Sequence, residues 1–202
     1  RNGMIDHSIG FCFGNGKSRL KYDLNDFIGK FPTIGCNGLY REYEPDTLVI
    51  VDMPMIEEVE HSNYLGRVVC SSLDHTSLYE MERVSHRHWH GERLYKHFGW
   101  SAGPTALRIL CEENPELDTV NLLGFDLYGT ADGKVNNVYV DSRNYAKSTT
   151  GAIHPGSWID QLFECFRMFP NIQFYRVGPL NDTVPPEWKV LDNIKFIDQI
   201  FI

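Results

Sequence analysis

Six short apolar runs recur along the chain, at residues 9–13, 32–36, 47–51, 67–71, 120–123 and 172–177. Several are continuously apolar and rich in β-branched residues, which is typical of strands that are covered on both faces of a sheet. Helix-like segments lie between them, at residues 20–30, 53–64, 101–114 and 156–169. This alternation predicts an α/β fold: a doubly wound, mostly parallel sheet with helices on both faces, in three α/β/α layers.

The length of 202 residues predicts a single domain over residues 1–202. The formal charge of −8 argues against general nucleic-acid binding, which requires a basic surface. The five cysteines are scattered and form no CxxC pair, so we expect reduced, buried thiols in a cytoplasmic protein. No apolar run approaches the roughly 20 residues that span a bilayer, and no signal peptide is visible. The oligomeric state stays open, a homo-oligomer included.

Two segments lack a clear period, residues 72–100 and 129–153. Irregular segments of this length are usually lids or binding loops, so we expect them to border a site. In the segment 156–169 the apolar side chains follow helical spacing, which predicts core packing. They are Trp158, Ile159, Leu162, Phe163, Phe166 and Phe169.

A glycine-rich turn, Gly-Asn-Gly-Lys-Ser at residues 14–18, follows the first apolar run. A strand that enters such a turn and then a helix is a common way to hold a phosphate. The turn is not a Walker A loop, because that motif needs glycine five positions before the glycine of the Gly-Lys pair, and Phe11 stands there. A GxGxxG fingerprint also fails, because its third glycine would fall at Arg19.

Several short blocks, taken in order, resemble the bacterial metal-independent sialyltransferases and related Rossmann-like proteins. They are the turn at 14–18, Gly-Cys-Asn-Gly at 35–38, the run ending at Asp52, Ser-Ala-Gly at 101–103, Gly-Phe-Asp-Leu-Tyr at 124–128, and His154 before a helix. The blocks lie between residues 9 and 178. Without the histidine they are also similar to an archaeal-type pterin pyrophosphokinase family.

The first resemblance implies a glycosyltransferase that moves a sugar from a CMP-activated donor to a small-molecule or glycan acceptor, with no metal or other cofactor. His154 would be the general base, and the phenols of Tyr128 and Tyr139 would stabilise the leaving phosphate. The donor contacts would be Asn15, Gly16, Ser18, Asn37, Asp52, Ser101, Ala102 and Gly103. Asp52 departs from the family, which has an asparagine there, and a carboxylate repels phosphate.

Two other functions remain open. One is a nucleotide-dependent pyrophosphokinase or phosphotransferase with magnesium at Asp52 or Asp126; the other is a non-catalytic nucleotide-binding protein. A separate candidate metal site is the alternating set His86, His88 and His90, since imidazoles on one face of a strand can bind a transition metal. The simpler interpretation of that stretch is a polar, partly basic loop.

Overall fold

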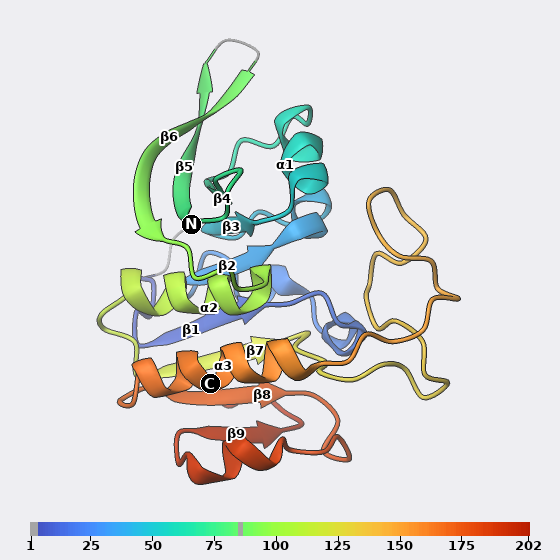
Figure 1. The fold of residues 1–202 in the computed structure, drawn as a ribbon. Helices are drawn as coiled ribbons and strands as arrows, with labels where there is room; N and C mark the ends of the chain where they lie inside the picture. Colours follow the sequence, from blue (N-terminus) through green and yellow to red (C-terminus); the bar gives the residue numbers. More distant parts are fainter. Residues whose placement is uncertain (1–3, 85–86) are drawn as a thin grey trace.

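The computed structural model describes residues 4–84 and 87–202, and the side chains of residues 83–90 lie outside this description. Over the described residues the fold is α/β, with one nine-stranded, mostly parallel sheet and three α-helices (Figure 1). The strands are β1 (Ile9–Phe13), β2 (Thr33–Cys36), β3 (Thr47–Ile50), β4 (Val68–Ser71), β5 (Ser77–Val84), β6 (Arg87–Lys96), β7 (Thr119–Leu123), β8 (Gln173–Val177) and β9 (Ile194–Ile197). Their order in the sheet is β6-β5-β4-β3-β2-β1-β7-β8-β9.

The strand β1 lies inside the sheet and pairs in parallel with both β2 and β7. The chain adds β2, β3 and β4 on one side of β1, and then β7, β8 and β9 on the other. The strand order therefore reverses between β1 and β7. The carboxyl ends of these parallel strands share one edge of the sheet, and ligands of open α/β sheets bind outside that edge, at such a reversal.

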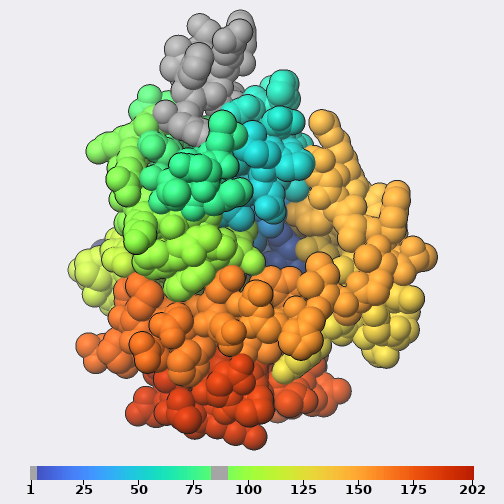
Figure 2. Space-filling model, in the orientation of Figure 1, coloured from blue at the N-terminus to red at the C-terminus, as the bar shows by residue number. Residues whose placement is uncertain are grey.

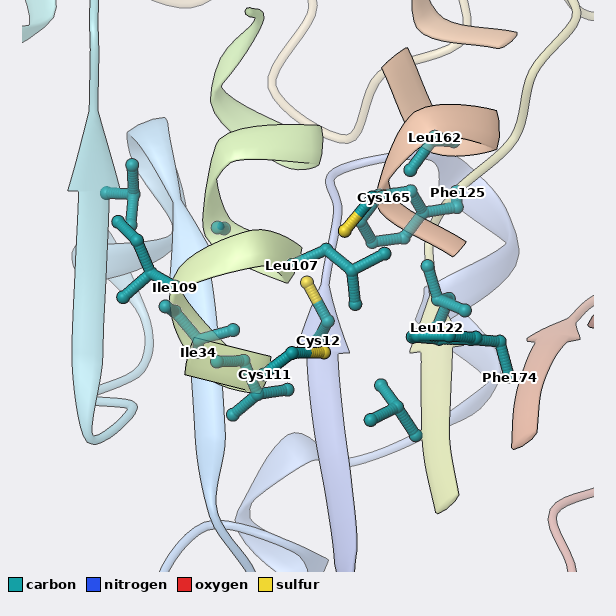
Figure 3. Close-up of a cluster of buried hydrophobic side chains, with 14 of the residues drawn as sticks. Cys12, Ile34, Leu107, Ile109, Cys111, Leu122, Phe125, Leu162, Cys165 and Phe174 are labelled. Carbon is teal, nitrogen blue, oxygen red and sulfur yellow. The ribbon is translucent and has the colours of Figure 1, made fainter. Parts of the chain in front are cut away.

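Both faces of the sheet are covered. The helices α2 (Ala102–Glu113) and α3 (Gly156–Met168) pack on one face, and Figure 3 shows Leu107 of α2 and Cys165 of α3 above Cys12 of β1. The other face packs against α1 (Met53–Glu60) and short 3-10 turns. Because side chains alternate along a strand, Cys12 faces α2 and α3, whereas Phe11 and Phe13 belong to the opposite cluster.

All five cysteines are buried and free, as the sequence predicts. Burial raises the pKa of the Cys36 thiol to about 12, so this thiol stays protonated near neutral pH although it lies beside the cleft described below. None of the described helices combines the length and the apolar character that crossing a bilayer requires.

The prediction of an irregular segment over residues 72–100 is wrong, because β5 and β6 form an antiparallel hairpin that extends the sheet beyond β4 (Figure 1). The pairing of these strands shifts register between Leu78 and Tyr79 and again between Tyr79 and Met81. Such irregularities interrupt the period of two by which a strand is recognised in a sequence. The segment 129–153 does lack regular strands and helices, as expected.

The prediction of an α-helix over residues 20–30 is also wrong. The chain forms two 3-10 turns instead, Lys17–Lys21 and Leu24–Asp26. The Asp23 carboxylate accepts a hydrogen bond from the Asn25 N–H at 3.0 Å, which starts a new turn where a helix would continue. Phe27 then stacks on Phe11, with ring centroids 4.3 Å apart. The apolar residues of this segment therefore cover the sheet without forming a helical stripe.

Candidate functional site

The turns after β1 and β7 cross in close contact at the reversal point. The N–H of Gly14 donates to the carbonyl of Leu123 at 2.7 Å, and the N–H of Gly16 donates to the carbonyl of Gly124 at 2.8 Å. A Cβ on Gly14 would lie 2.5 Å from the Gly124 carbonyl oxygen, and Gly124 itself has a φ of 76°. Only glycine fits this crossing, because the two backbones meet without room for side chains.

A cavity of about 680 Å³, counted to its open mouth, lies beside this crossing. We call it the switch-point cavity. Figure 2 shows the surface hollowed there, with the blue N-terminal residues visible between the cyan, green and orange segments. Its lining comprises Gly14, Asn15, Gly16, Cys36, Asn37, Ser101, Ala102, Gly103, Pro104, Gly124, Phe125, Asp126, Leu127, Asn136, Asn137, Trp158 and Leu162. Residues from six separate segments of the chain thus meet at one place.

Asp126 fastens the glycine turn to the end of β7. Its carboxylate accepts the N–H of Ser18 at 2.9 Å and also accepts the Ser18 hydroxyl. The N–H of Lys17 donates to the Asn136 side chain at 2.9 Å. The N–H groups of residues 14, 16, 17 and 18 are therefore all engaged within the protein. The turn is a wall of the cavity and not the cradle of free N–H groups that its sequence suggests.

Beneath the turn lies Arg19, a cation that is only 2% exposed. Its Nε donates to the carbonyl of Gly14 at 3.1 Å, and its Nη2 donates to the Tyr139 hydroxyl at 2.9 Å. The same Nη2 lies 3.4 Å from Oδ1 of Asn15, whose Nδ2 donates to the carbonyl of Cys36 at 2.9 Å. The Asn15 side chain thus joins the turn to β2, and both its Nδ2 and its Oδ1 are hydrogen-bonded within the protein.

Asn37 follows β2 and adopts a φ of 52°, a left-handed conformation that asparagine tolerates. Its Oδ1 is buried and has no hydrogen-bond partner. The next N–H, that of Gly38, donates to the Tyr145 hydroxyl at 2.7 Å. A buried acceptor without a partner costs free energy, and a ligand N–H or O–H would satisfy it.

The first turn of α2 contributes Ala102 and Gly103 to the switch-point cavity. Ser101 precedes the helix without capping it through its side chain, and its own N–H donates to the Gln161 side chain at 2.9 Å. The first N–H groups of a helix have no partner within the helix, and its positive end favours an anion. This helix start therefore suits a phosphate.

Two further cavities adjoin the first. The loop cavity, of about 670 Å³, shares Asp126, Asn136, Asn137 and Trp158 with it and is otherwise lined by Tyr128 and the segment 129–153. The Asp52 cavity, of about 770 Å³, shares Asn37 with it and is lined by Asp52, Pro54, Met55, Asn144, Tyr145 and Ala146. All three lie at the carboxyl edge of the sheet.

The residues predicted from the sequence are distributed over these cavities. Asn15, Gly16, Asn37, Ser101, Ala102 and Gly103 line the switch-point cavity, Tyr128 lines the loop cavity and Asp52 lines the third. Ser18, Tyr139 and His154 line none of the three. Six of the eight predicted donor contacts line one cavity, whereas the three proposed catalytic side chains do not come together.

The hydroxyls of both tyrosines have protein partners. Tyr128 donates to the carbonyl of Thr183 at 2.8 Å. Tyr139 donates to the Glu42 carboxylate at 2.7 Å and accepts from Arg19, and burial, followed by the bond to Glu42, raises the pKa of this phenol. His154 is exposed, and its Nδ1 accepts the N–H of Gly156 at 3.1 Å.

Sequence reasoning missed several residues of the cavity lining, among them two asparagines and a tryptophan. Asn136 and Asn137 lie within the segment 129–153, where no period marks them, and the helical spacing of 156–169 predicts that Trp158 packs in the core. Two adjacent asparagines in a loop are a weak signal. Their place is set by long-range hydrogen bonds from the Lys17 N–H to Asn136 and from the Val138 N–H to the carbonyl of Asn15.

The histidine set gives no metal site to describe. His86 lies outside the described residues, and so do the side chains of His88 and His90. Among the side chains that the structure does describe, no group of three or more His, Cys, Asp or Glu is arranged to hold a metal ion.

A polar network holds the segment 139–145 beside the Asp52 cavity. Arg41 donates to both oxygens of the Glu58 carboxylate, at 2.9 and 2.6 Å, to the Ser142 hydroxyl at 2.7 Å and to the carbonyl of Arg143 at 2.7 Å. Asn144 donates to Glu58 at 3.1 Å. Burial alone would raise the pKa of Glu58, but hydrogen bonds from Arg41 and Tyr40 outweigh it and hold that pKa below 4.5.

We expect this network to give the protein an acid-sensitive stability. Because folding depresses the pKa of Glu58, its contribution to stability is present above the unfolded-state pKa of this carboxylate and is lost as the pH falls through the lower folded-state pKa. Glu58→Gln should lower stability at neutral pH and flatten the acid limb of a plot of unfolding free energy against pH. Glu57→Gln, at an exposed position on the same helix, is the control. An unchanged acid limb in Glu58→Gln would contradict this role.

Comparison with models of known protein families, with curated proteins and with solved structures finds no match to this chain.

Proposed function

We propose that the protein is a Rossmann-like, sialyltransferase-like glycosyltransferase that binds a CMP-activated sugar in the switch-point cavity and transfers the sugar without a metal. One observation carries the proposal: a cavity at the reversal between β1 and β7 joins the start of α2 to the asparagine side chains of three separate loops.

The charge of the lining favours a donor with a single phosphate. Among the described residues that line the cavity none is Lys, Arg or His, and Asp126 is acidic. A triphosphate would need cations to balance its charge, whereas one phosphodiester can rest on the positive end of a helix. Asp126 is moreover occupied on both carboxylate oxygens by Ser18. These features support a CMP-type donor over ATP with magnesium.

In the proposed reaction, an acceptor hydroxyl oxygen bonds to the sugar carbon while the bond from that carbon to the phosphate oxygen breaks. The electron pair leaves with CMP, and the hydroxyl proton passes to the imidazole of His154. His154 follows Ile153, which lines the loop cavity. Tyr128 must exchange the Thr183 carbonyl for the phosphate. Tyr139 is engaged by Arg19 and Glu42, so we assign it the positioning of the glycine turn.

The test is binding followed by turnover. Calorimetry should detect binding of CMP and of CDP, but only weak binding of ATP with magnesium. Incubation with CMP-sugars should release free CMP. Asn37→Gly keeps the left-handed backbone and removes the free Oδ1, so it should weaken CMP about 10-fold. Asp141→Gly is the control, since residue 141 also has a positive φ of 66° but lines none of the three cavities.

A second candidate, a non-catalytic nucleotide-binding protein, is favoured by the occupied hydroxyls of Tyr128 and Tyr139. It predicts CMP binding without CMP-sugar turnover and no effect of His154→Ala. If neither CMP nor CDP binds, both candidates fail, and tight binding of ATP with magnesium would favour the phosphotransferase.

A further inference from the structure

Three residues that line the Asp52 cavity, each from a separate element, carry hydrogen-bond acceptors. Asp52 precedes α1 and caps no backbone N–H of that helix, so its exposed carboxylate faces solvent. Asn37 brings a buried Oδ1 that has no partner. Asn144 uses its Nδ2 toward Glu58 at 3.1 Å and toward the carbonyl of Pro54 at 3.4 Å, which leaves its Oδ1 as an acceptor.

The same cavity offers little to an anion. Among the described residues that line it none is Lys, Arg or His, and the backbone N–H of nearby Gly38 is already bonded to Tyr145. The remaining wall is apolar, formed by Pro54, the buried Met55 and the ring of Tyr145. The site thus combines one negative charge, two amide oxygens and an apolar surface.

We infer that the Asp52 cavity binds the primary ammonium group of an alkyl amine or amino sugar. An ammonium has three N–H donors and no acceptor, which matches the carboxylate of Asp52 and the Oδ1 atoms of Asn37 and Asn144. The carbon chain lies on Met55 and Tyr145. Hard divalent cations fit less well, because they favour several carboxylates and the cavity lining contains one.

This assignment goes beyond the proposed function. Asn37 lines both this cavity and the switch-point cavity, and the two lone pairs of its Oδ1 can accept one hydrogen bond from each ligand, so a bound amine lies next to the proposed donor. The ammonium site itself does not depend on CMP. Its role as part of an acceptor subsite rests on the proposed function, and the two can be tested separately.

The test uses two small probes of equal size, n-propylammonium and 1-propanol, each titrated with and without CMP. The side-chain amide signals of Asn37 and Asn144 are followed by NMR. Propylammonium should shift both signals saturably, and 1-propanol should not. Asp52→Asn should weaken propylammonium about 3- to 10-fold, a modest loss because the carboxylate is exposed to solvent. Asp160→Asn, at an exposed position on α3, should leave the binding unchanged.

Several results would overturn the inference: no shift with propylammonium, equal binding of 1-propanol, equal affinity in Asp52→Asn, or saturable shifts with magnesium or calcium alone. Failure of CMP to bind, with propylammonium still binding, would reject the proposed function and leave this site standing. If CMP binds but propylammonium fails to bind the protein without CMP, the ammonium site is rejected and the proposed function stands.

Discussion

Gly14→Ala should lower the free energy of unfolding by about 2–3 kcal/mol, a value typical of severe overpacking. The new Cβ would lie 2.5 Å from the carbonyl oxygen of Gly124 and 3.0 Å from its carbonyl carbon. Both are backbone atoms of a second loop, so no side-chain rotation relieves the contact. The turns after β1 and β7 must separate, which strains the hydrogen bonds from Gly14 to Leu123 and from Gly16 to Gly124. Urea denaturation followed by tryptophan fluorescence measures the loss.

Gly151→Ala is the matched control, because a Cβ there meets nothing within 4 Å. It should change stability by less than about 0.5 kcal/mol, as surface substitutions usually do. If Gly14→Ala were as stable as Gly151→Ala, the close crossing of the two turns would not exist in solution. Gly14→Ala should also weaken CMP, since the displaced turn is a wall of the switch-point cavity.

Arg19→Met should destabilise the protein by about 3 kcal/mol, because it leaves buried acceptors without their donor. The carbonyl of Gly14 and Oδ1 of Asn15 both lose the guanidinium, and the Tyr139 hydroxyl loses the donor that lies 2.9 Å away. Methionine fills much of the volume, so the loss reports on polar contacts more than on packing. Thermal and urea unfolding, read with CMP calorimetry, should show lower stability and lower affinity together.

Arg167→Met provides the comparison for this variant. Arg167 is 58% exposed and pairs with Glu164 on the same helix at 3.6 Å, a kind of pair that contributes under about 1 kcal/mol. Arg19→Lys keeps the charge but loses the planar fork, and it should fall between wild type and Arg19→Met. Equal effects of Arg19→Met and Arg167→Met would show that the buried guanidinium does not hold the glycine turn.

The central part of the sheet follows from the sequence because its strands are covered on both faces. Short, continuously apolar runs such as 9–13 and 47–51 are typical of strands that are buried on both faces of a sheet. The helices at 101–114 and 156–169 were predicted for a related reason, since each buries a stripe against the sheet. Their ends agree with the observed helices to within one residue.

The outer strands were harder to predict because only part of their surface is buried. In β9 Lys195 is exposed and the other three residues are only partly buried. The pairing of β5 with β6 contains two register shifts. The candidate site, too, could be predicted only in part. The motifs point to the turn, Asn37 and the start of α2, but the oxygens that accept the N–H groups of Ser18 and Lys17 belong to Asp126 and Asn136. Contacts between such distant residues leave no local pattern.

The crossing of the turns after β1 and β7 has a consequence for the synthesis of the chain. Ser18 and Lys17 are 108 and 119 positions away from the side chains that hold them. At translation rates of about 5–20 residues per second, the glycine turn waits roughly 5–25 s for these partners. Until then the N–H groups of the turn are solvated and the switch-point cavity is not formed. A ligand of the switch-point cavity can therefore act on finished chains but cannot assist the first half of the protein while it is being made.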